Sequence, residues 1–231
     1  MTKFSILICC CFVLLISCEA TERSKFSIAV SFDEAVSPES KDGRLLLMLS
    51  SDDSKEPRFQ ISEGLHTQLV FGMNVENMAP GESITFDKSV FGYPYPSLEN
   101  VPPGEYNAQA LLHVYETFNL STGHTVKLPM DNGEGQHWNT SPGNLYSKPF
   151  KITVGETGIE NVSLVMNQEI PPIPEPEDTE WIKHIKIKSE KLSEFYGRDM
   201  YLGAHVLLPK GFNEHPEAKY PLMVFHGHFP S

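Results

Sequence analysis

Cysteine is scarce in this chain and confined to its beginning. The four cysteines are Cys9, Cys10, Cys11 and Cys18, and none follows Cys18 in the 231 residues. Residues 19–231 can therefore form neither an internal disulfide nor a zinc site built from thiolates. Stability must come from the burial of a hydrophobic core, for which an apolar content of 40% is sufficient.

Positive charge is also scarce, and it is not clustered. The chain has 18 lysines and arginines against 30 acidic residues, which gives a net charge of −12. A nucleic-acid partner requires clustered cations that displace counterions from phosphates. We therefore expect no nucleic-acid partner, and an acidic surface of this kind favours solubility.

A helical repeat is missing as well, whereas short strands recur. The clearest strand alternates over residues 104–115, where Tyr106, Ala108 and Ala110 share one face. Residues 44–49 form a short apolar run, as expected for a strand that is buried on both faces. Further strands are expected over residues 26–32, 65–75, 148–154 and 161–166. The pattern predicts a mainly β protein, with a β-sandwich over residues 25–168.

One segment resembles a feature of immunoglobulin-like domains. The run Pro102-Pro103-Gly104-Glu105-Tyr106, followed by an alternating strand, is similar to the approach to a late strand of such domains. The resemblance implies that the β-sandwich is immunoglobulin-like, although the antibody-type cysteine pair is absent.

The N-terminus has the pattern of an export signal. A short start containing Lys3 precedes residues 4–16, which are apolar apart from Ser5. This run is shorter than the roughly 20 residues that a helix needs to cross the hydrocarbon core of a bilayer. The pattern therefore predicts a removable signal peptide rather than a membrane-spanning helix.

The end of this signal resembles a bacterial lipobox, with the sequence Leu15-Ile16-Ser17-Cys18. In lipoproteins of that type the cysteine becomes the lipidated first residue. The resemblance implies a signal peptide over residues 1–17, a lipidated tether over residues 18–24, and attachment to a membrane of the cell envelope through Cys18. The alternative is ordinary signal cleavage after Ala20, which would give a secreted protein.

A long segment without a strand pattern, residues 129–144, separates two of the predicted strands, and loops of this length are often functional. His137 and Trp138 could stack on a sugar or pack against a neighbouring domain. Alternatively, Trp138 simply holds the loop against the sandwich.

The same loop contains Asp131, Asn132 and Glu134, which suggest a calcium site. Their spacing does not match an EF-hand, because glycines occupy its third and fifth positions. We expect no metal at this loop.

Prolines mark a boundary after the sandwich. Pro171, Pro172, Pro174 and Pro176 exclude both a helix and a regular strand ladder. Residues 169–180 are therefore expected to form a semi-rigid extended linker.

The pattern changes after the linker. Residues 181–188 and 200–208 alternate as two amphipathic strands, and Leu208-Pro209-Lys210-Gly211-Phe212 forms a turn. The apolar residues 222–225 then predict a buried strand, which leads into His226-Gly227-His228. A metal site at the two histidines is the weaker interpretation, because no third ligand has a suitable spacing.

Residues 181–231 resemble the opening of an esterase-type α/β-hydrolase domain. The resemblance implies carboxylic-ester hydrolysis by a serine nucleophile, an ester substrate and no cofactor. It also implies an oxyanion-hole loop in which Gly227 allows a tight turn and His228 presents a backbone N–H. The preceding sandwich would be an accessory domain.

The departures from this family concern the chemistry itself. No Gly-x-Ser-x-Gly motif occurs in the 231 residues, and the nucleophile, acid and base are all missing. We therefore expect the chain to be an incomplete fragment of such an esterase, inactive on its own. The alternative is a non-catalytic surface lipoprotein whose β-sandwich binds a carbohydrate or a protein.

Overall fold

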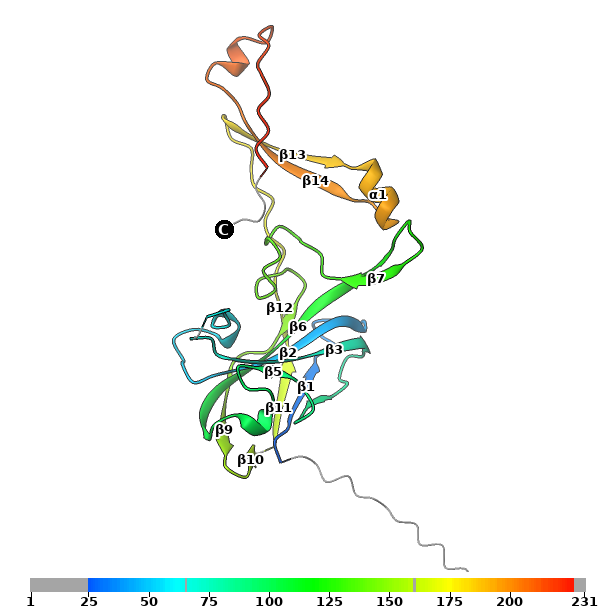
Figure 1. The fold of residues 1–231 in the computed structure, drawn as a ribbon. Helices are drawn as coiled ribbons and strands as arrows, with labels where there is room; N and C mark the ends of the chain where they lie inside the picture. The colour runs from blue at the N-terminus through cyan, green and yellow to red at the C-terminus, as the bar shows by residue number, and fades with distance from the viewer. Residues whose placement is uncertain (1–24, 65, 160, 227–231) are drawn as a thin grey trace, which may run out of the picture.

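The computed structural model describes residues 25–226 except 65 and 160, and it is mainly β, with 40% strand against 8% helix and with curled sheets. Figure 1 shows a β-rich part, residues 25–169, and a hairpin with one short helix that stands away from it. The strands are β1 (Ile28–Phe32), β2 (Lys41–Ser50), β3 (Leu69–Met78), β4 (Ile84–Phe86), β5 (Gly92–Tyr93), β6 (Gly104–Asn119), β7 (Thr125–Leu128), β8 (Leu145–Tyr146), β9 (Phe150–Gly155), β10 (Gly158–Ile159), β11 (Val162–Met166), β12 (Gln168–Glu169), β13 (Ile182–Lys188) and β14 (Tyr201–Leu207). The helices are α1 (Glu190–Tyr196) and the 3-10 turns η1 (Pro57–Phe59), η2 (Leu98–Asn100) and η3 (Phe212–Glu214).

The larger sheet is built around β2. Its main path runs β10–β9–β6–β2–β3–β5, and β7 and β8 add to β6. Leu47 of β2 lies opposite Phe71 of β3 on one side and Ala110 of β6 on the other. Leu47, Met48 and Leu49 are all fully buried, which confirms burial on both faces for this end of the predicted run. Arg44 and Leu46, on the same face as Met48, are only half-buried.

The smaller sheet has the order β11–β1–β4. β1 runs parallel to β11 and antiparallel to β4. Its alternating residues Ile28, Val30 and Phe32 are almost completely buried and belong to the same core cluster as the inward residues of β2 and β6. The inner faces of the two sheets therefore share one hydrophobic core, which supplies the stability that disulfides do not.

Two predicted strands have different lengths in the structure. The strand expected over residues 65–75 begins only at Leu69, since the chain before it forms a bend and turn. The strand expected over 104–115 extends to Asn119, because its last residues pair with β7 from Glu116↔Leu128 to Asn119↔Thr125. This extension carries the end of β6 away from the core and towards α1 (Figure 1).

The linker and the hairpin follow the sequence pattern closely. Residues 170–180 form no helix or strand, and β13 and β14 then pair antiparallel from Ile182↔Leu207 to Lys188↔Tyr201. The connection contains α1, a short helix that the sequence pattern does not predict. The Ser189 hydroxyl accepts a hydrogen bond from the Leu192 N–H at its start, and Gly197, with φ of 66°, ends it.

The prediction of a buried strand over residues 222–225 is wrong. These residues form no strand, and 77–91% of each residue's surface is exposed. A strand requires a neighbour to satisfy its backbone N–H and C=O groups, and no described strand lies beside this segment. Apolar composition alone was therefore insufficient to bury it.

Candidate functional site

Three of the predicted site residues, Cys18, Gly227 and His228, lie outside the described residues. The other two, His137 and Trp138, lie in the 129–144 loop, where His137 is exposed and Trp138 is half-buried. The loop is therefore the part of the sequence-based site that the structure resolves.

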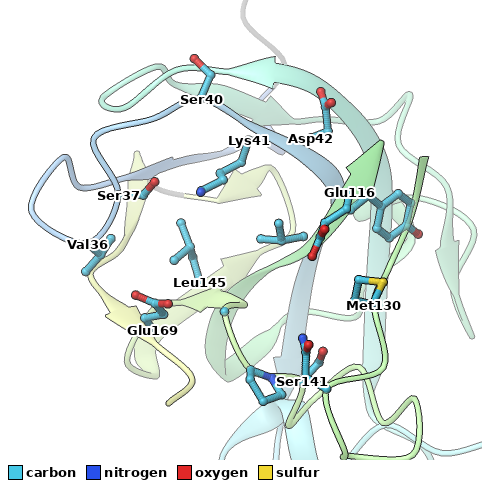
Figure 2. A pocket seen from close by; sticks show the side chains of 15 residues that line it. Val36, Ser37, Ser40, Lys41, Asp42, Glu116, Met130, Ser141, Leu145 and Glu169 are labelled. Carbon is cyan, nitrogen blue, oxygen red and sulfur yellow. The ribbon is translucent and has the colours of Figure 1, made fainter. Parts of the chain in front are cut away.

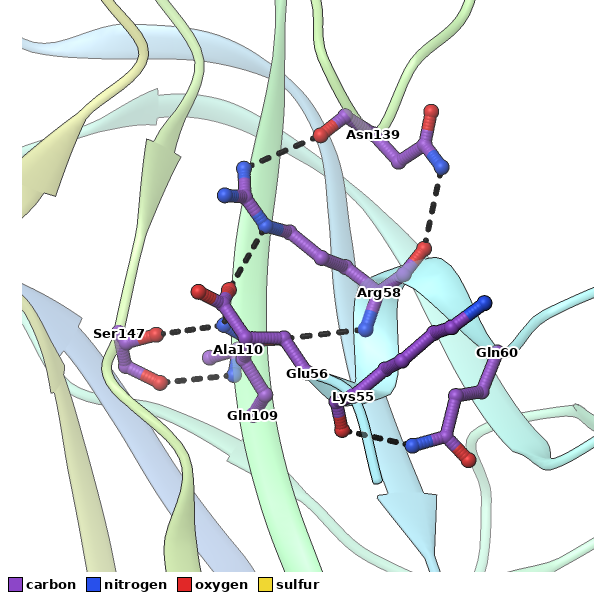
Figure 3. A network of polar contacts seen from close by, with 8 residues as sticks. All are labelled: Lys55, Glu56, Arg58, Gln60, Gln109, Ala110, Asn139 and Ser147. Atoms are coloured by element: carbon purple, nitrogen blue, oxygen red, sulfur yellow. Dashed lines mark hydrogen bonds and ion pairs between the residues drawn. The ribbon is translucent and has the colours of Figure 1, made fainter. Parts of the chain in front are cut away.

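The second half of this loop is anchored by Arg58, from the turn η1, through Asn139 (Figure 3). The Arg58 guanidinium donates a hydrogen bond to the Asn139 carbonyl at 3.1 Å, and the Asn139 side-chain amide donates to the Arg58 carbonyl at 3.2 Å. The guanidinium also lies over the rings of Phe59 and Tyr146, at 4.4 and 4.2 Å. Arg58 is 9% exposed, so its charge needs these partners.

A buried glutamine connects Arg58 to the larger sheet. The side-chain oxygen of Gln109 accepts a hydrogen bond from the backbone N–H of Arg58 at 3.0 Å. Its side-chain amide donates to the Glu56 carboxylate and to the Ser147 carbonyl, both at 2.9 Å. Glu56 in turn pairs with the Arg58 guanidinium at 2.9 Å. Gln109 is fully buried, and this network satisfies both its donor and its acceptor groups.

The last residue of the loop, Asn144, adds a second anchor. Its side-chain amide donates to the Trp138 carbonyl at 2.7 Å, while its side-chain carbonyl oxygen accepts from the Val114 N–H of β6 at 2.9 Å. Polar side chains therefore anchor the second half of the loop. Sequence reasoning considered only Trp138 for this role, although Asn144, next to Gly143, carried a turn signal.

The carboxylates that suggested calcium serve the loop backbone instead. Asp131 accepts hydrogen bonds from the Gly133 and Gly135 N–H groups, at 2.8 and 3.3 Å, and Glu134 accepts from the Asn132 N–H at 2.8 Å. Across residues 25–226, apart from 65 and 160, no group of three histidine, cysteine or acidic residues is placed to hold a metal ion.

The loop forms one wall of a hollow of about 400 Å³, which we call the Ser141 cleft (Figure 2). Its opposite wall is the connection from β1 to β2, and β6 and Glu169 of β12 complete it. A second hollow of about 350 Å³, the His113 pocket, lies between β6 and the first half of the loop. Met130 lines both, so the two hollows adjoin.

Two of the carboxylates of the Ser141 cleft are already paired with cations. The Asn77 N–H, which donates to Asp42 at 2.8 Å, and the Lys127 ammonium at 2.9 Å together hold the pKa of Asp42 below its ordinary value. Glu116 forms an ion pair with Arg198, which follows α1. Each of these two carboxylates therefore has a cationic partner.

Burial lowers the pKa of His113, which lines the adjoining pocket, although the nearby Glu134 opposes this shift. Its ring packs edge-to-face against Tyr115, with a centroid separation of 5.5 Å. His113 is therefore neutral at pH 7 and can donate or accept one hydrogen bond without adding charge.

The end of β6 and the turn after it contact the C-terminal hairpin. The Ser121 N–H donates to the Phe195 carbonyl of α1 at 2.8 Å, and Phe118 packs edge-to-face against Tyr196 at 5.6 Å. Arg198 lies over the Phe118 ring at 5.2 Å while it pairs with Glu116. One residue, Glu116, thus belongs both to the cleft and to the contact between the two parts of the chain.

Comparison of the chain with protein-family models, curated proteins and solved structures finds no match. None of the helices in the described part of the chain is both long and apolar enough to cross a membrane.

Proposed function

We propose that the chain is the N-terminal portion of an exported esterase-type α/β-hydrolase. In this proposal, residues 25–168 form an immunoglobulin-like accessory domain, and residues 181–231 open the hydrolase domain. The observation that carries it is the order of elements after the linker: an antiparallel hairpin, a proline-glycine turn and an exposed apolar segment.

A side-chain contact at the start of β6 supports the immunoglobulin-like assignment. The Tyr106 hydroxyl donates to the Pro102 carbonyl at 3.0 Å, four residues earlier. Immunoglobulin-like domains contain a tyrosine corner of this kind near the start of strand F. Ala108, two residues later and fully buried, lies where antibody domains have their second cysteine.

The strand order supports the same assignment. If β6 corresponds to strand F, then β9, β2 and β3 match strands G, C and C′ in both chain order and sheet order. β1 and β4 are antiparallel neighbours in the other sheet, as strands B and E are. The departure is β11, which pairs parallel with β1 after the strand that would be G.

The hydrolase assignment is supported by exposed apolar side chains in the C-terminal part. Leu202 and Leu207 of β14 are 54% and 77% exposed, and Leu222 and Phe225 reach 86% and 91%. Apolar surface of this extent is typical of a face that another element covers. In an α/β-hydrolase, further strands and helices would provide that cover.

The chemistry of the proposal follows from ester hydrolysis. Attack on the ester carbonyl creates an oxyanion, which backbone N–H donors stabilise in the transition state. Gly227 and His228 would form one side of that oxyanion hole, and the residue after the nucleophile would provide the second donor. The serine, acid and histidine of the triad would come from sequence beyond residue 231.

The decisive experiment reads the coding DNA beyond the codon for Ser231. We expect a further strand and then Gly-x-Ser-x-Gly, an acid and a histidine in that order, in frame or after one frameshift. Downstream DNA that encodes no such motif would refute the hydrolase assignment. The 231-residue chain should show no turnover of a small chromogenic ester, and turnover that a serine-directed inhibitor abolishes would contradict our assignment of the triad.

We propose further that the protein is exported and lipid-anchored through Cys18, on the basis of the Leu15-Ile16-Ser17-Cys18 motif. Expression with labelled palmitate should label the protein and place it in the membrane fraction. The Cys18→Ser variant should be neither labelled nor found in the membrane fraction. Release of the wild-type protein without label would instead support cleavage after Ala20 and secretion.

A second function, non-catalytic binding by the β-rich part, is supported by the Ser141 cleft. A hollow of about 400 Å³ lies within the size range of small-ligand sites. This function is compatible with an accessory domain of an esterase and also with a surface lipoprotein that has no catalytic domain.

A further inference from the structure

The Ser141 cleft is lined by a serine whose hydroxyl has no hydrogen-bond partner among the described residues. Ser141 is 3% exposed, and its hydroxyl forms no hydrogen bond with any residue in the described ranges. No fully buried side-chain nitrogen or oxygen among those residues lacks a hydrogen bond. The Ser141 hydroxyl therefore retains some accessible surface, and because Ser141 lines the cleft, we take the hydroxyl as able to donate to and accept from a ligand there.

The cleft has charges of both signs that nearly balance. Lys127 and Arg198 neutralise Asp42 and Glu116 from outside. The remaining charges are Lys41 and Glu169, and neither forms an ion pair with another residue that the structure describes (Figure 2). The cleft thus offers one cationic donor and one anionic acceptor to a ligand.

The charges of the residues that line the cleft favour one class of ligand over others. A phosphate or sulfate requires several converging cations, whereas the described residues that line this cleft include one lysine, Lys41, and three carboxylates. A metal ion requires a group of oxygen or nitrogen ligands, which the described residues do not form. A neutral molecule rich in hydroxyl groups uses donors and acceptors equally and gains from both Lys41 and Glu169.

Apolar side chains line the cleft between these polar groups. Val114, Met130 and Leu145 contribute to its wall, and they provide surface for the C–H faces of a sugar ring. The His113 pocket, which Met130 also lines, has a further volume of about 350 Å³. A ligand that spans both hollows would be longer than a single sugar unit.

We propose that the Ser141 cleft and the His113 pocket together bind a short neutral oligosaccharide. The Ser141 hydroxyl, the Lys41 ammonium and the Glu169 carboxylate hydrogen-bond to sugar hydroxyl groups. This proposal deepens the binding function of the β-rich part and rests on that function. It does not depend on the hydrolase assignment, so either proposal can fail without the other.

The test is calorimetric titration of the purified protein with neutral tetrasaccharides from β-glucan, xylan, mannan and α-glucan. We expect at least one to bind. The Ser141→Ala and Lys41→Met variants should each bind it roughly three- to tenfold more weakly, because each loses one hydrogen bond. The matched controls Ser163→Ala and Lys151→Met, exposed residues of β11 and β9 outside the cleft, should bind as the wild type does. Thermal unfolding of every variant verifies that it is folded.

Three results would overturn the proposal. The first is that none of the four tetrasaccharides binds. The second is that a tetrasaccharide binds with the same affinity to both cleft variants and to the wild type. The third is that the protein binds only inorganic phosphate, oligogalacturonate or tetra-alanine, which are the anionic and peptide probes of the same titration.

Discussion

Arg58 and Asn139, which are 81 residues apart, exchange two hydrogen bonds at the base of the 129–144 loop. The guanidinium of Arg58 donates to the backbone of Asn139, and the side chain of Asn139 donates to the backbone of Arg58. Each residue thereby fixes the main chain of the other. The wall of the Ser141 cleft is consequently attached to η1 and, through Gln109, to the centre of the larger sheet.

We predict that Arg58→Met destabilises the protein by about 2 kcal/mol, because the Asn139 carbonyl and Glu56 lose a charged donor. The free energy of unfolding in urea measures this loss. Arg44→Met is the matched control, since the guanidinium of Arg44 bonds Asn74 on the exposed surface, and it should cost less than about 1 kcal/mol. Equal costs for the two variants would show that the Arg58 network does not anchor the loop.

We predict that the folded protein loses stability in acid, in part because of Asp42. Its folded-state pKa lies below its ordinary value, so its contribution is fully present above about pH 4 and is lost as the pH falls through the folded-state pKa. Asp42→Asn should cost about 1 kcal/mol at pH 7 and progressively less towards pH 2. Urea unfolding at pH 7, 5 and 3 tests this. Asp53→Asn, at an exposed residue whose carboxylate accepts no hydrogen bond from the described residues, should show no such convergence.

His113 predicts a second, milder pH dependence. Its folded-state pKa lies below the ordinary value near 6.5, so the unfolded chain takes up a proton first as the pH falls. Its contribution to stability is therefore complete above about pH 6.5 and decreases as the pH falls towards the folded-state pKa. Between pH 7 and pH 5, the free energy of unfolding of the His113→Gln variant should therefore decrease less than that of the wild type. The exposed His66→Gln control should retain it.

The backbone of Gly197 allows a prediction about the contact between α1 and the end of β6. The residue has φ of 66°, and an added Cβ would lie 2.8 Å from the Asn119 carbonyl oxygen. Gly197→Ala should therefore weaken the contact of α1 with the end of β6, at a cost of about 1 kcal/mol for the left-handed conformation alone. Limited proteolysis should then cut residues 170–180 faster than in the wild type.

The matched control for this experiment is Gly203→Ala in β14, where an added Cβ would meet no atom within 4 Å. Its rate of cleavage in the linker should equal that of the wild type. If Gly197→Ala is cut no faster than Gly203→Ala, the contact between α1 and β6 does not hold the hairpin.

Local pattern was sufficient for much of the β-rich part. The apolar run at Leu45 to Leu49, the alternation after Tyr106 and the prolines after Ile170 each predicted an observed feature. The strands follow from the spacing of apolar residues along the chain, and the linker follows from the restricted backbone of proline. Residues close together in the sequence determine both properties. The short helix α1 was missed because seven residues are too few to show a helical period.

Local pattern was insufficient wherever partners are distant. The apolar run from Leu222 to Phe225 satisfied the pattern of a buried strand, yet it is exposed because no described strand pairs with it. Trp138 was one candidate for holding the 129–144 loop, but the hydrogen bonds of Arg58 and Asn144 to this loop were not predicted.

The sequence by itself determined the β character of the chain, the boundary at the prolines and the absence of disulfides after Cys18, because composition and period decide those properties. Only the tertiary structure decided that the Ser141 hydroxyl has no partner among the described residues, that Asp42 and Glu116 pair with cations, and that Met130 lines two hollows. Those properties arise where segments far apart in the sequence converge, and no local pattern encodes such contacts.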